Sequence, residues 1–383
     1  MKKAHVLSGI DRIALANGAL AGRRVGLMTN PTGIDHSLRS TIDLIAGSYR
    51  LTALFAVEHG IRGDIQAGET VTDAIDPDTG VPVFSAYGSA SHFTEPMLDA
   101  FDVLVFDMQD VGARFYTYLY SLAYAMQACN RAGKAMVVLD RINPLGGLRH
   151  GGTRLDPRFA SFVGDYELPT QYALTIGEFA RYVRDYLGLS LPLTVIPLEG
   201  WTRSMRLDDT DLPWVAPSPN CPNLETALCY TGTCIFEGTN ISEGRGTTQP
   251  FQLIGAPWLN PGELEQRMAK VETPGIRFRR ASFRPTFSKH QGELCGGVQM
   301  HILDRDLADA FSAGLLLLEE IRLLSGPRFR FLSSDGQSFF IDKLLGTDVY
   351  RTGVLSAQAL IESSRAPVEA FIRETGKYRL YAD

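Results

Sequence analysis

The chain has 383 residues, of which 45% are hydrophobic and 21% charged, and its formal net charge is −6. This length favours two domains, and the composition supports a substantial core and excludes an intrinsically disordered chain. The negative charge argues against nucleic acid as a partner, because phosphate binding needs a basic face. Five cysteines without a CxxC pair indicate reduced thiols rather than a disulfide framework.

The N-terminus carries Lys2 and Lys3, but Asp11 and Arg12 interrupt the residues that follow before an apolar segment can form. No run approaches the roughly 18 apolar residues that a membrane span requires. We therefore expect no signal peptide, no transmembrane helix, no membrane partner and a cytoplasmic location.

The first two thirds of the chain alternate strand-like and helical patterns. Strands are expected at 24–29, 51–57, 81–85, 102–107, 134–139, 193–196 and 233–236, and helices at 40–46, around 124–128 and from 175 onwards. Continuous apolar strands that alternate with helices predict a mostly parallel sheet covered on both faces.

The last third changes character. It contains a helical pattern at 261–271, strand-like segments at 275–278 and 297–302, and a strongly amphipathic helix at 306–324. We therefore expect a smaller α+β domain at 259–383, packed against an α/β domain at 1–258.

Polar turns follow four of the expected strands. The strand at 51–57 ends in Glu58 and His59, with Arg62 and Asp64 close behind. The other three turns contain Asn30, the run from Asp107 to Arg114, and the trio Asp140, Arg141 and Asn143. Because ligands bind beyond the carboxyl ends of the strands in open α/β sheets, these turns predict one shared cleft.

The sequence lacks the motifs of several classes of enzyme. No GxGxxG follows an expected strand, and no GxSxG, HExxH or paired Cys/His spacing occurs. Gly238 and Gly244 are six positions apart rather than the five of a phosphate loop, and Arg245 replaces its lysine. We therefore expect no cofactor and no metal site. Carboxylates beside arginines and aromatic rings instead suit a polar ligand such as a sugar.

Seven segments together resemble the exo-β-N-acetylmuramidases of the NamZ type, a family long catalogued as a domain of unknown function. They are GLMTNPTG at 26–33, EHGIRGD at 58–64, FDMQDVGARFYTY at 106–118, VLDRINPLGG at 138–147, SFVG at 161–164, WVAPSPN at 214–220 and EGTNISEGRGTTQPF at 237–251. The resemblance implies a Rossmann-like three-layer domain, a smaller C-terminal domain and a cleft between them. It also implies release of N-acetylmuramic acid from the non-reducing ends of peptidoglycan fragments, with MurNAc-GlcNAc as substrate. Its catalytic glutamate corresponds to Glu58.

The chain departs from this family pattern at three places. Val57 and Ile142 stand where proline is usual, and Tyr172-Ala173 stands where His-Gly is usual. The last change replaces a side chain that would face the cleft, so it bears on substrate preference.

Glycoside hydrolysis needs an acid that protonates the leaving oxygen and a second group that stabilises the oxocarbenium-like centre. Glu58 is the candidate acid, and His59 is a candidate for orienting water or binding a sugar hydroxyl. The second group remains open among Asp110, Glu237, Glu243 and the sugar's own 2-acetamido group. The full set of candidate binding residues is Asn30, Arg62, Asp64, Arg114, Tyr116, Tyr118, Asp140, Arg141, Asn143, Asn240 and Arg245. Its four arginines are candidates to bind the lactyl carboxylate, because guanidinium groups bind carboxylates in a bidentate manner.

Two other functions are consistent with parts of this pattern. A non-catalytic muropeptide or amino-sugar binding protein would keep the arginines and aromatic rings but would need no catalytic acid. A phosphatase or nucleotide-binding enzyme would need a metal site or a phosphate loop. The pair Glu58 and His59 favours a glycosidase. The sequence predicts neither an oligomeric state nor a stereochemical outcome.

Overall fold

The computed structural model describes residues 3–58, 60–61, 74–86 and 93–383. A seven-stranded sheet forms the N-terminal half, with strand order β3-β4-β2-β1-β5-β6-β9. Its strands are β1 (Arg24–Thr29), β2 (Arg50–Ala56), β3 (Ala74–Ile75), β4 (Pro82–Ser85), β5 (Val103–Asp107), β6 (Ala135–Leu139) and β9 (Leu193–Ile196). All neighbouring pairs are parallel except β3 and β4. The predicted, mostly parallel sheet is confirmed, and Pro82 begins its strand, where a missing N–H is tolerated.

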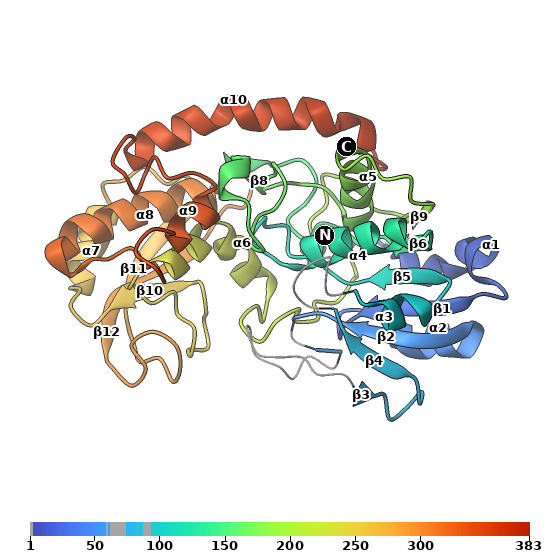
Figure 1. The fold of residues 1–383 in the computed structure, drawn as a ribbon. Helices are drawn as coiled ribbons and strands as arrows, with labels where there is room; N and C mark the ends of the chain where they lie inside the picture. The colour runs from blue at the N-terminus through green and yellow to red at the C-terminus, as the bar shows by residue number, and fades with distance from the viewer. Residues whose placement is uncertain (1–2, 59, 62–73, 87–92) are drawn as a thin grey trace.

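Helices cover both faces of this sheet (Figure 1). One face packs on η1 (Gly9–Ala16), α1 (Asn17–Leu20) and α2 (Thr41–Ser48), and the other on α3 (Glu95–Asp99), α4 (Tyr118–Arg131) and α5 (Ile176–Tyr186). Successive residues of a strand point to opposite faces, so Leu27 joins the first core and Met28 joins the second. This is the three-layer α/β arrangement that the sequence predicts.

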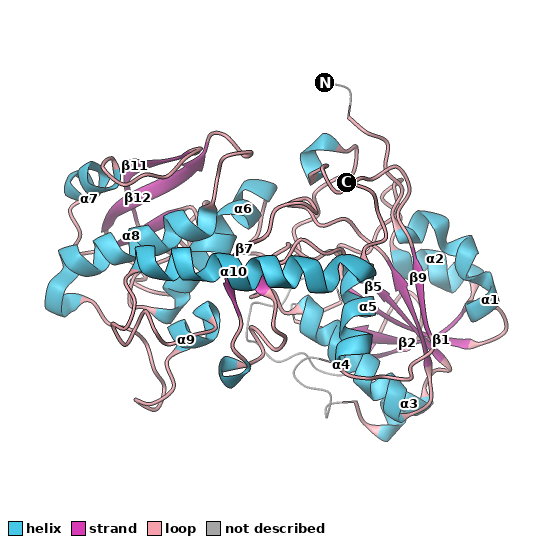
Figure 2. Ribbon diagram, turned by 90° about the horizontal axis from the view of Figure 1, so that it is seen from above, coloured by secondary structure: helices cyan, strands magenta, loops and turns pink. Residues whose placement is uncertain are grey.

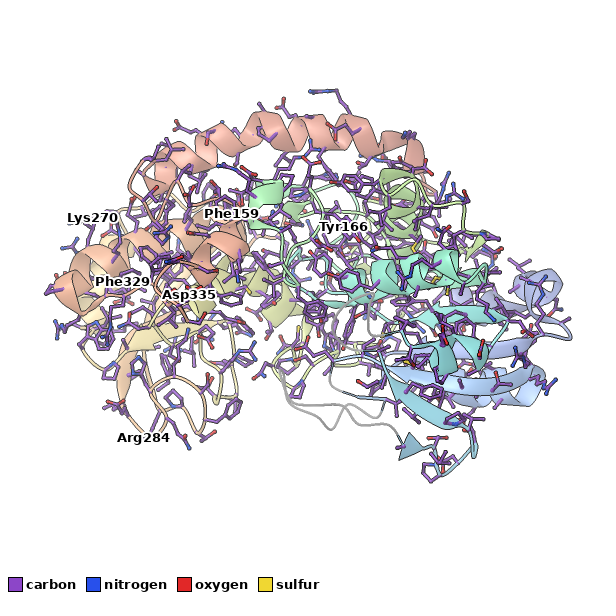
Figure 3. All side chains as sticks on the ribbon, in the orientation of Figure 1. Phe159, Tyr166, Lys270, Arg284, Phe329 and Asp335 are labelled. Carbon is purple, nitrogen blue, oxygen red and sulfur yellow. The ribbon has the colours of Figure 1, made fainter. Side chains whose placement is uncertain are left out.

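α5 begins where the sequence predicts a helix. The Thr175 side chain accepts a hydrogen bond from the Glu178 backbone N–H, and the Glu178 side chain accepts one from the Thr175 N–H. This capping box pairs two N–H groups that the first helical turn would otherwise leave without partners. Tyr166, labelled in Figure 3, packs its ring 5.9 Å from Phe179 of α5 and 6.1 Å from Tyr120 of α4. The two helices are thereby held together on one face of the sheet.

The C-terminal half contains an antiparallel sheet of order β10-β12-β11 (Figure 2). Its elements are α6 (Leu224–Thr233), η5 (Cys234–Gly238), β10 (Leu253–Ala256), α7 (Pro261–Met268), β11 (Ile276–Phe283), β12 (Cys295–Ile302), α8 (Ala310–Ser325), η6 (Gly326–Arg328) and α9 (Phe340–Leu345). The α+β character that the sequence predicts is therefore present. The domain boundary after residue 258 stays a prediction, and β10, which precedes it, pairs with β12.

The long helix α10 (Ala357–Thr375) runs across both halves of the molecule (Figure 1). It packs on α8 and on β7 (Gly151–Arg154), which pairs with β8 (Pro169–Gln171). The remaining short helices are η3 (Pro157–Phe159), η4 (Leu207–Asp209) and η7 (Gly376–Tyr378). After α10 the chain returns to the first half, where the Leu380 N–H donates to Glu178 (2.8 Å). The C-terminal tail therefore ties the second half back to the first.

The strand expected at 233–236 is wrong. These residues lie in the last turn of α6 and in η5, and Cys234, Ile235 and Phe236 are buried. A short apolar run buried on all sides does not distinguish a strand from a helix. α10, β7 and β8 were not predicted. Within the described residues, no helix is long and apolar enough to cross a membrane.

Candidate active site

The strand order reverses at β1, which lies between β2 and β5. Such a switch point leaves a crevice beyond the carboxyl ends of the strands, because the connections on its two sides run in opposite directions. Asn30 follows β1, Glu58 follows β2 and Asp110 follows β5. The topology therefore brings three of the expected site residues to one edge of the sheet.

Glu58 sits in a tight turn between β2 and the crevice. The Gly60 N–H donates to the Val57 carbonyl (3.0 Å), and Gly60 adopts a φ of +76°, which a side chain would disfavour. The Thr117 hydroxyl donates to Glu58 Oε2 (2.6 Å), and Thr117 directly precedes the first residue of α4. The end of β2 and the start of α4 therefore position the Glu58 carboxyl group, and Glu58 remains partly exposed.

Tyr118 lies at the centre of the crevice residues. Its hydroxyl donates to the Pro217 carbonyl (2.5 Å), and its ring is 4.8 Å from that of Tyr116 in an edge-on contact. Burial raises the pKa of the Tyr118 phenol, the polar groups of Tyr116 and Asn30 partly offset this rise, and the nearby charges of Glu58 and Asp110 add to it. Tyr118 is therefore a neutral residue within electrostatic reach of both carboxyl groups.

Three buried polar atoms around Tyr118 have no hydrogen-bond partner among the described residues: Asn30 Nδ2, Asp110 Oδ2 and the Tyr116 hydroxyl. Buried polar atoms are nearly always paired, because an unpaired one costs about 1–3 kcal/mol. Unpartnered buried atoms also occur elsewhere in the described residues, but these three gather at the end of the sheet that carries Glu58, where a polar ligand could bond them.

Asp110 is the carboxyl group with the most unusual environment. The Gly112 N–H (2.8 Å) and the Tyr172 hydroxyl donate to its Oδ1. These bonds favour the charged form, but burial outweighs them and raises the pKa of Asp110 to about 7. The carboxyl group therefore exchanges a proton near neutral pH. Tyr172 follows β8, and the adjacent Ala173 has a φ of +53°, a strained value for alanine that fixes the local backbone.

A second charged cluster lies in the C-terminal half. Arg245 pairs with Glu237 (2.8 Å) and Glu243 (3.5 Å), and Lys289 pairs with Glu243 (2.8 Å). Two basic side chains and two carboxyl groups therefore pair with each other inside this cluster. The Arg245 guanidinium also stacks 5.1 Å over the Phe251 ring, and its side chain is 20% exposed.

Aromatic rings connect the two clusters. The Tyr116 ring lies 6.2 Å from that of Tyr230, and the Tyr230 ring lies 4.6 Å from that of Phe251, beneath Arg245. Edge-on aromatic packing of this kind is rigid and apolar. The two clusters therefore border one region where the halves of the molecule meet.

Four other expected binding residues bond mostly to the protein itself, although the buried Nε of Arg114 has no partner among the described residues. Arg114 is fully buried and donates to the carbonyls of Thr153, Leu168 (2.8 Å) and Leu344 (2.7 Å). Arg141 forms a two-point ion pair with Asp107.

Asp140 accepts from the N–H groups of Gly177 and Arg141 and from the hydroxyls of Thr175 and Tyr381. The Asn143 side chain is buried and bonds the backbone of Leu145 and Leu174. These contacts identify structural roles for all four residues. Asn240 similarly bonds the backbone of Arg328 and Arg330.

His59, Arg62 and Asp64 lie outside the described residues. The structure also adds residues that sequence reasoning missed, namely Thr117, Tyr230 and Lys289. Thr117 lies inside the segment at 106–118 and could have been predicted, whereas Tyr230 and Lys289 reach the region only through the tertiary fold. Tyr172, which the sequence marks as a departure from the family pattern, donates to Asp110.

Comparison with known proteins supports this picture of two joined halves. The sequence matches the family "Exo-beta-N-acetylmuramidase NamZ, N-terminal" over residues 25–225 and its C-terminal counterpart over residues 228–381. It is 46% identical to the peptidoglycan β-N-acetylmuramidase NamZ of Bacillus subtilis, covering 99% of this chain and 92% of that protein.

Two crystal structures of DUF1343 family proteins from Bacteroides fragilis share the fold. One superposes with a TM-score of 0.89 at 33% identity and covers 99% of this chain and 100% of the other. The second has a TM-score of 0.78 at 29% identity and covers 99% of each chain. The chain belongs to the exo-β-N-acetylmuramidase NamZ family.

Proposed function

We propose that this glycosidase releases N-acetylmuramic acid from the non-reducing ends of peptidoglycan fragments, with the disaccharide MurNAc-GlcNAc as a substrate. Family membership supports the reaction class. The three buried, unpartnered polar atoms beside Glu58 support the location of the sugar site. Burial raises the pKa of Asp110 to about 7, but it does the same for Asp140, whose bonds all lie within the protein, so family membership carries the argument for turnover.

Glu58 is the proton donor in this proposal. It protonates the glycosidic oxygen as the bond from that oxygen to C1 of the muramic acid breaks. Glu237 and Glu243 are less suited to this role, because their carboxyl oxygens are engaged by Arg245 and Lys289.

The carbonyl oxygen of the sugar's 2-acetamido group is the nucleophile. It bonds to C1 as the leaving group departs, and Asp110 Oδ2 accepts the acetamido N–H proton, which gives a neutral oxazoline. Water then attacks C1 and breaks the oxazoline C–O bond, giving its proton to Glu58 while the ring nitrogen regains the proton from Asp110. Two displacements at C1 retain its configuration. The open oxygen of Asp110 and its pKa of about 7 support this role.

Arg245 is the proposed contact for the lactyl carboxylate. Arg114 and Arg141 are buried in bonds to the protein, whereas the Arg245 side chain, although paired with Glu237 and Glu243, is 20% exposed beside the aromatic rings that lead to Tyr116. Arg245→Ala should therefore cost about 2–4 kcal/mol in transition-state binding of a muramide. An N-acetylglucosaminide has no lactyl group, so its transition-state binding should change little when Arg245 is replaced. Arg284, an exposed arginine of the same half (Figure 3), provides the matched alanine control.

The direct test of the activity uses 4-nitrophenyl β-N-acetylmuramide and its N-acetylglucosaminide counterpart. The wild-type protein should release nitrophenol from the muramide much faster than from the glucosaminide. It should also split MurNAc-GlcNAc into two monosaccharides. Binding of both aryl sugars without any release would overturn the proposal in favour of a binding protein.

A further inference from the structure

Three side chains of metal-ligating type meet on the N-terminal half, although they lie far apart in the sequence. His5 Nδ1 is 2.7 Å from Asp211 Oδ2, and His36 Nε2 is 3.6 Å from the same oxygen. One ligand atom from each residue lies within 4.8 Å of the other two. The sequence predicts no metal site, because no local motif links positions 5, 36 and 211.

The backbone holds His5 and Asp211 together independently of their side chains. The Ala4 N–H donates to the Asp209 carbonyl (2.8 Å), and the Asp211 N–H donates to the Ala4 carbonyl (2.9 Å). The Val6 N–H donates to Asp211 Oδ1 (3.0 Å), which leaves Oδ2 directed at the two imidazoles. The carboxylate is therefore oriented by a bond from outside the cluster, as ligating carboxylates usually are.

His36 is placed by a separate contact. Its backbone N–H donates to Asp11 Oδ1 (2.7 Å), and Asp11 Oδ2 accepts from the backbone N–H of Ser8 at the start of η1 (2.8 Å). The His36 ring packs edge-on against the His5 ring, with centroids 4.8 Å apart. The loop between β1 and α2 thereby brings the second imidazole to the first.

We propose that His5, His36 and Asp211 form a binding site for a first-row divalent transition-metal ion such as Zn²⁺, separate from the sugar site. Two imidazoles and one carboxylate are a ligand set typical of Zn²⁺ and its first-row neighbours. Mg²⁺ and Ca²⁺ prefer oxygen ligands and would be held poorly by the two histidines.

The geometry needs only a small adjustment to accept the ion. Zn²⁺ bonds nitrogen and oxygen ligands at about 2.0–2.2 Å, which places neighbouring ligand atoms roughly 3–3.5 Å apart. The two distances to Asp211 already bracket this range. His5 has a side chain that is 66% exposed, so it can rotate to complete the set and leaves a path for the ion from solvent.

A bound ion would connect the N-terminal segment, the β1–α2 loop and the segment that ends at Asp211. A ligand that binds only the folded state stabilises it by mass action. The midpoint temperature of unfolding should therefore rise with Zn²⁺ concentration.

The test titrates the tag-free protein with Zn²⁺ by isothermal calorimetry. Wild type should bind one ion, whereas His36→Ala and Asp211→Asn should bind at least about tenfold more weakly, because each loses a ligand. His301→Ala, which removes a histidine of β12 outside the cluster, should match wild type. Mg²⁺ should give no comparable heat. Equal Zn²⁺ affinity in wild type and both ligand variants would overturn the site.

A second measurement covers the case in which a ligand variant folds poorly. His5→Ala removes a mostly exposed side chain, so the fold should tolerate it. Co²⁺ added to wild type should give visible absorption bands that report its coordination, and His5→Ala should weaken or shift them. Identical spectra for the two proteins would contradict a role for His5. Zn²⁺ that leaves the unfolding temperature of wild type unchanged would contradict binding to the folded state.

Discussion

Two sets of buried polar side chains lie in the N-terminal half, and they differ in whether the protein itself supplies their partners. Arg203 and Glu178 are both fully buried, and Arg203 bonds Glu178 at 2.6 and 2.8 Å and also the carbonyls of Gly147 and Ala173. Around Tyr118, by contrast, Asn30, Asp110 and Tyr116 each keep a buried atom without a partner among the described residues. The first set stabilises the fold, and the second leaves positions open for a substrate.

The largest effect on stability should follow from removing Arg203 from its buried ion pair with Glu178. Arg203→Ala leaves the Glu178 charge buried without its partner, which should lower the free energy of unfolding by about 3–5 kcal/mol. Arg158, which pairs with Asp156 on the surface, is the matched control, and its alanine variant should unfold like wild type. Denaturant titration measures both. Equal unfolding midpoints for Arg203→Ala and Arg158→Ala would show that the buried pair does not stabilise the fold more than the surface pair.

Asp110→Asn should damage activity and spare stability. Loss of the proton acceptor should lower kcat for a muramide by about 10²-fold or more. Burial raises the folded-state pKa of Asp110 to about 7 from its ordinary value of 3.8. The unfolded chain therefore loses this proton first as pH rises, and wild-type stability should fall between about pH 4 and 7.

The asparagine variant lacks this titration, so its stability should fall less over the same interval. Urea unfolding of both proteins at several pH values between 4 and 8 measures the difference. Parallel stability curves would show that Asp110 is not held with a raised pKa.

The smallest expected effects come from removing the hydroxyl groups of Tyr116 and Tyr120. Tyr116→Phe removes a hydroxyl that has no partner among the described residues, so stability should stay the same or rise slightly, while kcat/KM falls by about tenfold or less. Tyr120→Phe removes a hydroxyl that donates to the Arg114 carbonyl, and it should cost about 1 kcal/mol of stability with little loss of activity. A reversed pattern would place the open site elsewhere.

The two sets also show which features of the site the sequence predicts and which it does not. Apolar strands followed by polar turns correctly predict the parallel sheet and bring Asn30, Glu58 and Asp110 to one edge. They do not distinguish Arg114, which bonds backbone carbonyls, from Arg245, which keeps an exposed face. That distinction depends on partners supplied by segments far away in the chain.

The short apolar run at 233–236 shows a second limit, since burial on all sides hides whether a segment is strand or helix. The cluster of His5, His36 and Asp211 shows a third. His5 and Asp211 are 206 positions apart and are joined by the pairing of the segments around Ala4 and Thr210, while a bond to Asp11 places His36 beside them.

The role of Glu58 as proton donor to the leaving oxygen is tested most directly by comparing how much Glu58→Gln slows substrates with different leaving groups. Glutamine keeps the size and hydrogen-bonding reach of Glu58 but has no acidic proton. Turnover of MurNAc-GlcNAc, whose leaving group needs protonation, should fall by about 10³-fold or more. Turnover of an aryl muramide with a strongly acidic phenol should fall far less, because that group departs unprotonated. An equal loss on both substrates would contradict the account and identify Glu58 as a base or nucleophile.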